Sequence, residues 1–83
     1  MNPNHMRELL VDWYNNNVAD FDAPKIEVAD TYVVWFCYTL GDAKALISTV
    51  RHDHMYYELT YNMNKNVLYV DQYLKVKHTD IEF

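Results

Sequence analysis

Apolar side chains near the N-terminus recur at intervals of three and four residues, the spacing that places them on one face of an α-helix. This apolar stripe consists of Met6, Leu9, Leu10, Trp13, Tyr14 and Val18. The opposite face carries Arg7, Glu8, Asp12 and Asn15. Asn2 or Asn4 can cap the helix start, with Pro3 beside it, and the run Asn15-Asn16-Asn17 favours an end nearby. The pattern therefore predicts an amphipathic helix over about residues 3–18.

Beyond a turn-rich connector at residues 19–30, the apolar positions take the two-residue period of β-strands. Strands are predicted at about residues 31–40, 43–50, 55–62 and 67–77. The intervening segments are short, which favours antiparallel neighbours. Residues 1–83 are therefore expected to form a single α+β domain, with one N-terminal amphipathic helix packed on a four-stranded antiparallel β-meander.

The first predicted strand is apolar in both of its side-chain rows. One row contains Tyr32, Val34, Phe36, Tyr38 and Leu40, and the other contains Val33, Trp35 and Cys37. Such a strand is typical of a central position, or of a sheet covered on both faces. After it, Gly41-Asp42 predicts a type II′ turn. In the connector, Phe21 is expected to anchor the chain to the core.

Aromatic residues are abundant for a chain of 83 residues, with eight Tyr, three Phe and two Trp. One helix of this length cannot cover all of the Tyr side chains, so several are expected on the uncovered face of the sheet. There they can act as cross-strand pairs that only stabilise the sheet. Alternatively, they form a recognition surface, since exposed Tyr and Trp dominate interface hot spots. The residues proposed for that surface are Trp35, Tyr56, Glu58, Tyr69, Asp71 and Tyr73.

The formal net charge of −5 opposes attraction to phosphate backbones, so nucleic acid and anionic membranes are poor candidate partners. No stretch approaches the ~20 apolar residues of a membrane span, and the N-terminus lacks the pattern of a signal peptide. The single Cys37 cannot form an internal disulfide and is expected to behave as a small hydrophobic residue. These features predict an intracellular protein in a reducing compartment.

Catalytic chemistry has little support in the sequence, and neither an enzyme nor a cofactor is expected. Cys37 lies between Phe36 and Tyr38, where a thiol is more often inert than nucleophilic. The chain has one Gly, so a phosphate-binding Gly-rich loop is excluded. A paired-carboxylate site at Glu58 and Asp71 is conceivable but unsupported. The weak metal candidate is the cluster His52, Asp53 and His54, whose imidazoles and carboxylate could bind Zn²⁺, although such a triplet is usually only solvated.

Four segments of the chain carry a resemblance to a known family. They are Tyr32-Val-Val-Trp-Phe-Cys-Tyr-Thr-Leu40, Lys44-Ala-Leu-Ile-Ser-Thr49, Tyr56-Tyr-Glu-Leu-Thr-Tyr-Asn62 and Tyr69-Val-Asp-Gln-Tyr73. Together they resemble a family of small uncharacterised phage and prophage proteins of low-GC Gram-positive bacteria, a domain of unknown function. That family typically has Asp-Gly before its Tyr-Tyr-Glu and Asn-Gly-Asp-Lys at the next hairpin. Here His54 and Asn62-Met-Asn-Lys65 occupy those positions, and no catalytic residue is implied.

The resemblance implies a non-enzymatic phage accessory protein that binds and inhibits or redirects a host protein, in replication or in anti-defence, including CRISPR interference. Its location would be the cytoplasm of the infected or lysogenic bacterial host. A first alternative is a protein that sequesters a nucleotide signal, stacking the base on Tyr or Trp with Arg51, Lys75 and Lys77 at the phosphate. A second alternative is a single-stranded nucleic-acid binder, which the negative charge disfavours. The sheet edges also allow a homodimer.

Overall fold

Asn side chains form local hydrogen bonds at both ends of the helix α1. The computed structural model describes residues 1–51 and 53–83, and α1 spans Pro3–Asn17. The Asn2 side chain accepts a hydrogen bond from the His5 backbone N–H at 2.8 Å, which caps the first turn. At the other end, the Asn17 amide donates to the Trp13 carbonyl at 2.8 Å. The predicted helix is confirmed.

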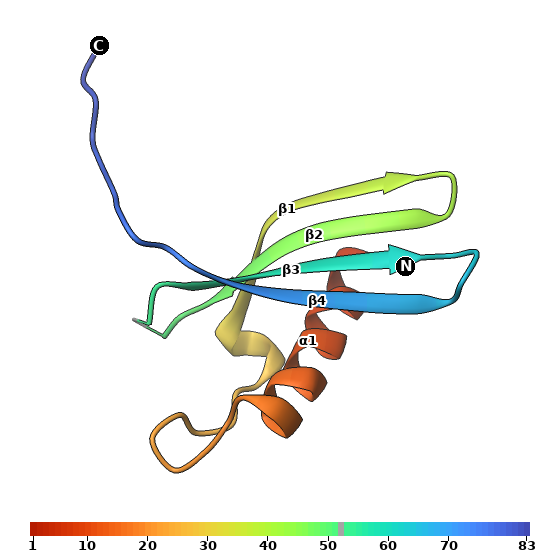
Figure 1. Ribbon diagram of the computed structural model, residues 1–83, viewed down its shortest axis with the longest axis horizontal. Coiled ribbons are helices and arrows are strands. Elements are labelled where there is room, and N and C mark those ends of the chain that lie inside the picture. The colour runs from red at the N-terminus through yellow and green to blue at the C-terminus, as the bar shows by residue number, and fades with distance from the viewer. Residues whose placement is uncertain (52) are drawn as a thin grey trace.

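Four strands follow α1 and form one antiparallel sheet in the order β1-β2-β3-β4 (Figure 1). After the short 3-10 helix η1 (Val28–Asp30), the strands are β1 (Thr31–Thr39), β2 (Asp42–Thr49), β3 (Met55–Asn62) and β4 (Val67–Leu74). The α+β class, with a helix packed on a meander, is therefore as predicted. The fourth strand is shorter than predicted, because residues 75–77 belong to an extended C-terminal tail.

The turn between β1 and β2 differs from the predicted type II′ turn at Gly41-Asp42. Its two central residues are Leu40 and Gly41, with φ values of 51° and 89°, and Thr39 pairs with Asp42. Positive φ at both central residues defines a type I′ turn, whose twist matches that of the flanking strands. Leu40 is thus part of the turn and not of the strand.

A β-bulge at Val34 rearranges the two side-chain rows of β1. Val33 pairs with Ile47 and Trp35 with Leu46, so the register shifts by one residue between them. Tyr32 is therefore on the same face as Trp35 and Cys37, whereas Val33 faces the same side as Phe36 and Tyr38. The uninterrupted alternation expected from the sequence is wrong at this point, because one extra residue reverses the side of every position before it.

The hydrophobic core lies between α1 and one face of the sheet. Its buried residues are Met6, Leu10 and Tyr14 from α1, Ile26 from the connector, Ala43, Ala45 and Ile47 from β2, and Tyr57 and Leu59 from β3. The helix residues are spaced four apart, so they form one stripe. At the centre, the Tyr57 ring packs edge-on against Trp13 and Tyr14, with centroids 6.1 Å and 6.0 Å away. Burial raises the pKa of Tyr57 to about 12.

The polar side of α1 fixes the connector in place. The Arg7 guanidinium donates to the Thr31 hydroxyl at 2.9 Å and to the Val28 carbonyl at 2.8 Å. Asn15 pairs with the backbone of Ile26 in both directions, at 2.8 Å and 2.9 Å. Phe21 is fully exposed, so the expectation that it anchors the connector is wrong. Hydrogen bonds from the helix replace the hydrophobic anchor.

The strand β1 lies at an edge of the sheet, which corrects its predicted central position. Since the order is β1-β2-β3-β4, β1 and β4 are the two edge strands. Cys37 is exposed, and its Sγ lies 3.9 Å from the Thr39 hydroxyl oxygen. The apolar residues on the second face of β1 therefore face solvent and not a second layer of the fold.

Candidate interaction surface

The face of the sheet opposite α1 is the candidate interaction surface and is called the open face below. Residues paired across antiparallel strands share a face, so the register defines its members. They are Tyr32, Trp35, Cys37 and Thr39 of β1; Asp42, Lys44, Leu46 and Ser48 of β2; Tyr56, Glu58, Thr60 and Asn62 of β3; and Val67, Tyr69, Asp71 and Tyr73 of β4.

All six residues proposed from the sequence belong to the open face. The pairs Tyr56–Tyr73 and Glu58–Asp71 are directly opposite each other across β3 and β4, and Tyr69 is opposite Thr60. Trp35 lies two strands from Glu58, in the same cross-strand row through Leu46. Trp35, Tyr69 and Tyr73 have 41%, 43% and 51% of their surface exposed. The structure thus brings these residues together on one accessible surface.

Sequence reasoning missed Tyr32 as a member of this surface. Strict alternation placed Tyr32 in a different row from Trp35, whereas the bulge at Val34 turns both side chains to the open face. Tyr32 is 47% exposed. Because this strand is apolar in both rows, the hydrophobic pattern does not indicate the bulge.

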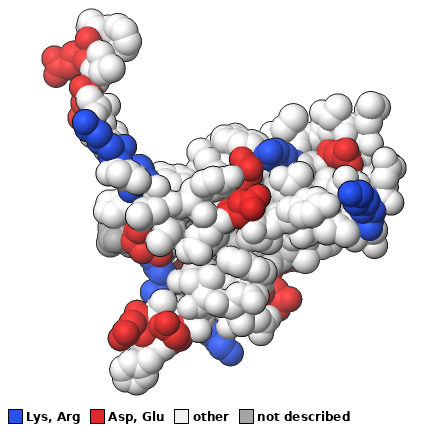
Figure 2. Space-filling model, in the orientation of Figure 1, with Lys and Arg blue, Asp and Glu red and all other residues white. Residues whose placement is uncertain are grey.

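Two carboxylates lie near the middle of the open face. Glu58 and Asp71 are directly opposite on β3 and β4, an arrangement that destabilises a sheet when both side chains are charged. Lys44 on β2 forms an ion pair with one of them, with its Nζ 3.4 Å from Glu58 Oε1. Figure 2 shows acidic atoms near the middle of the sheet within a mostly uncharged area. The surface is therefore aromatic with an acidic centre.

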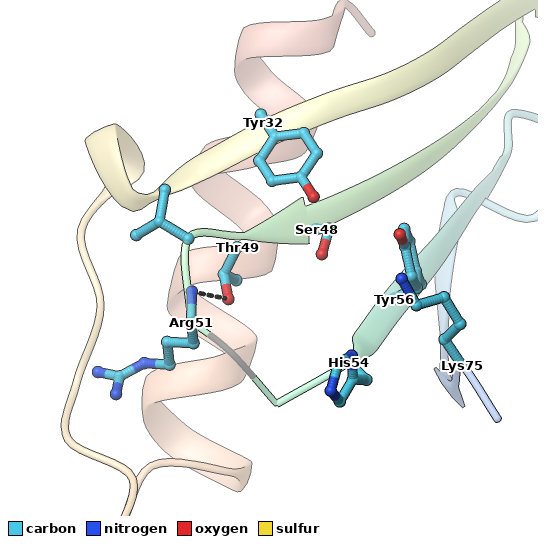
Figure 3. A pocket seen from close by; sticks show the side chains of 8 residues that line it. Tyr32, Ser48, Thr49, Arg51, His54, Tyr56 and Lys75 are labelled. Atoms are coloured by element: carbon cyan, nitrogen blue, oxygen red, sulfur yellow. Dashed lines mark hydrogen bonds between the residues drawn. The ribbon is translucent and has the colours of Figure 1, made fainter. Parts of the chain in front are cut away.

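A hollow of about 310 Å³ lies at one end of the open face. Tyr32 and Tyr56 stand on either side of the small, buried Ser48, as Figure 3 shows, and His54 and Lys75 complete the wall. The Ser48 hydroxyl donates to the Met55 carbonyl at 2.8 Å. The floor of the hollow is therefore the Ser48 hydroxyl, which already has a hydrogen-bond partner and lies between two phenol rings.

The three cations suggested for a phosphate do not all reach this hollow. Arg51 lines it, but its guanidinium points away from the two Tyr rings (Figure 3) and donates to the Pro24 carbonyl at 2.6 Å. Lys75 lines the hollow, whereas Lys77 lines a second, smaller hollow along the tail. Of these three cations, Lys75 alone has both the position and the charge for an anion bound beside Tyr56.

Two residues of the weak metal candidate, Asp53 and His54, belong to the described part of the chain. His52 lies outside the described residues. The Asp53 carboxylate accepts a hydrogen bond from the Met55 backbone N–H at 3.1 Å, which caps the start of β3. His54 has a φ of 59° and lines the hollow. Within residues 1–51 and 53–83, no group of three His, Cys, Asp or Glu side chains is arranged to hold a metal ion.

The fold and this surface define a class: a small domain in which one helix covers one face of a four-stranded sheet and leaves the other face open. The chain belongs to a family of unknown function, DUF6275, whose family model matches residues 3–83. This match confirms the expected membership of an uncharacterised family. No curated protein and no solved structure matches the chain. Among the described residues, α1 is the longest helix, and none has the length and apolarity to cross a bilayer.

Proposed function

We propose that this protein is a non-enzymatic binding module whose open face contacts a protein partner. The observation that carries the proposal is the exposure of Tyr32, Trp35, Tyr69 and Tyr73 on one continuous face. Large aromatic side chains lose little conformational entropy on binding and bury a large area, so they are enriched at interface hot spots. Cross-strand stabilisation does not require this many aromatic residues, since β-branched residues also favour strands.

The acidic centre specifies the chemistry of the partner. Among the described residues, Glu58 forms an ion pair with Lys44, and Asp71 has no ion-pair partner. Two carboxylates on facing strands repel each other, and a cationic group placed over them would relieve that repulsion. The partner surface that fits is therefore apolar with Arg or Lys at its middle.

The resemblance to phage and prophage proteins makes a bacterial host protein the partner to test. In this proposal the module inhibits or redirects a host factor in replication or in anti-defence, including CRISPR interference, in the cytoplasm of the infected or lysogenic cell. A small acidic protein with an aromatic patch needs no catalytic group for that role, because occupying a host surface is sufficient.

A comparison of matched variants in a pull-down from bacterial host lysate tests the proposal. Trp35→Ala truncates an aromatic residue on the open face, and Phe21→Ala does the same on the exposed connector. Glu58→Lys reverses a charge on the open face, and Glu8→Lys does so on the exposed side of α1. A specific partner should be lost with Trp35→Ala and Glu58→Lys and retained with both control variants. Equal retention by all four folded variants would refute the role of the open face.

The hollow favours a second candidate, the sequestration of a nucleotide signal. Tyr32 and Tyr56 are two strands apart, about 10 Å between backbones, which leaves space for one planar ring above Ser48. Lys75 on the same wall could meet a phosphate. A thermal-shift screen with cyclic and linear nucleotides tests it, because a ligand at 100 times its Kd stabilises the fold by about 2.7 kcal/mol. The gain should disappear in Tyr56→Ala, and a screen without any shift would exclude this function.

A further inference from the structure

The outer edge of β4 is the part of the sheet that is open to a further strand. Sheet edges expose unpaired N–H and C=O groups, and bulges are one way in which proteins protect them. β1 has such a bulge at Val34. β4 pairs with β3 over eight residues without a register shift, from Val67 to Leu74. Its outer edge is therefore regular enough to accept a partner strand.

The hydrogen bonds to β3 determine which residues of β4 face outward. The Lys75 backbone N–H donates to the His54 carbonyl at 2.8 Å, and this pair continues the register of Met55 with Leu74. In an antiparallel pair, hydrogen-bonded and non-hydrogen-bonded positions alternate. The odd-numbered residues of β4 thus bond to β3. The residues with outward-facing backbone groups are Leu68, Val70, Gln72 and Leu74.

The C-terminal tail, residues 75–83, leaves the end of β4, bends and extends away from the domain (Figure 1). Its apolar side chains are highly exposed, with 88% for Val76, 73% for Ile81 and 117% for Phe83. Lys75 and Lys77 lie at its start, where Figure 2 shows basic atoms. The edge thus continues into a segment in which Val76 alternates with Lys75 and Lys77.

We infer that β4 and the start of the tail pair with the same segment of a second copy, antiparallel, around a two-fold axis at Tyr73. An edge-to-edge antiparallel dimer has its axis perpendicular to the sheet, so opposite residues share a face and the axis passes through a residue position. With Tyr73 at the axis, Asp71 of each copy is opposite Lys75 of the other. Val70 is likewise opposite Val76 of the second copy.

Charge disfavours the two registers with the axis at Asp71 or Lys75, and it leaves an axis at Leu74, with Asp71 opposite Lys77, as the alternative register. An axis at Asp71 would place the two Asp71 carboxylates opposite each other, and an axis at Lys75 would place the two Lys75 ammonium groups opposite each other. Like charges at opposite positions destabilise a sheet. An axis at Tyr73 instead gives two Asp71–Lys75 pairs. It also places the two Tyr73 rings at a non-hydrogen-bonded position, where side chains approach most closely.

The pairing goes beyond the proposed partner binding and does not depend on it. It joins two four-stranded sheets edge to edge, with both open faces on the same side. The acidic centre would then gain Lys75 of the second copy, and the aromatic surface would be doubled. Because the pairing involves only this chain, purified protein is sufficient to test it, and its failure would leave the pull-down result unchanged.

Sedimentation equilibrium on the purified full chain tests the charge pairs. Asp71→Lys alone and Lys75→Asp alone should each weaken the dimer about tenfold or more, since each turns two favourable pairs into two repulsive ones. The double variant Asp71→Lys/Lys75→Asp should restore it. Asp71→Lys/Lys77→Asp has the same net charge and should not. A chain that stays monomeric up to millimolar concentration would overturn the inference, as would restoration by the Lys77 variant instead.

Disulfide cross-linking tests the register of the dimer independently of charge. In a Cys37→Ser background, Tyr73→Cys should oxidise to a covalent dimer, because the two positions face each other across the axis. Tyr69→Cys should not, because the two Cys positions would be about 27 Å apart along the strands. Circular dichroism confirms that each variant is folded. A covalent dimer from Tyr69→Cys, or none from Tyr73→Cys in a folded protein, would refute the axis at Tyr73.

Discussion

Gly41→Ala tests whether backbone conformation or side-chain space makes glycine necessary in the β1–β2 turn. Gly41 has a φ of 89°, where an L-residue with a Cβ is strained. A Cβ built there would overlap Met63 Sδ and lie 2.7 Å from Met63 Cε. Both effects would destabilise the folded state, but they differ in how easily they can be relieved.

The conformational strain should dominate. Met63 is 49% exposed and has three rotatable bonds, so its thioether can turn into solvent at small cost. The positive φ cannot change without breaking the two-residue hairpin, and it costs about 1–2 kcal/mol for a residue with a Cβ. We therefore expect Gly41→Ala to lower the free energy of unfolding by about 1–2 kcal/mol.

A double-mutant cycle in urea separates the two contributions. Gly41→Ala, Met63→Ala and the double variant are compared with the parent protein by equilibrium unfolding followed by circular dichroism. If strain dominates, the coupling energy between the two sites should stay below about 0.5 kcal/mol. If Met63→Ala abolishes the cost of Gly41→Ala, the clash was the cause and the conformational reasoning is refuted.

Three further predictions follow from other contacts. Leu40→Gly should raise the free energy of unfolding by up to about 1 kcal/mol in urea titrations, because Leu40 has a φ of 51° and is 91% exposed; a loss would contradict the turn assignment. Arg7→Ala should lower the free energy of unfolding by about 2 kcal/mol in the same assay, and Arg7→Lys should restore only part of this loss, because the guanidinium donates hydrogen bonds to Thr31 and Val28 at the same time. Full restoration by Arg7→Lys would contradict the role of these two hydrogen bonds. Burial raises the pKa of Tyr57 to about 12 from 10.0, so the unfolded chain loses this proton first, and stability should fall between those pH values. Tyr57→Phe should show a shallower alkaline loss in urea titrations across that range; an identical pH profile would contradict the raised pKa.

The sequence alone determined the elements and most of the open face. The four-residue spacing of Met6, Leu10 and Tyr14 indicates a helical face, and the two-residue alternation of the strands indicates a sheet. Because alternation is a local property of extended chain, it also placed Tyr56, Glu58, Tyr69, Asp71 and Tyr73 correctly in relation to their own strand neighbours.

Only the tertiary structure decided how those rows meet. The bulge at Val34 moved Tyr32 to the open face, and the strand order placed β1 and Cys37 at an edge. The connector is fixed by Arg7 and Asn15 and not by Phe21. Register, edges and anchors depend on contacts between residues far apart in the chain, and periodicity contains no information about such contacts. The sequence therefore determined which side chains share a face of β3 and of β4, and the tertiary structure determined the rows of β1 and which side chains form one surface.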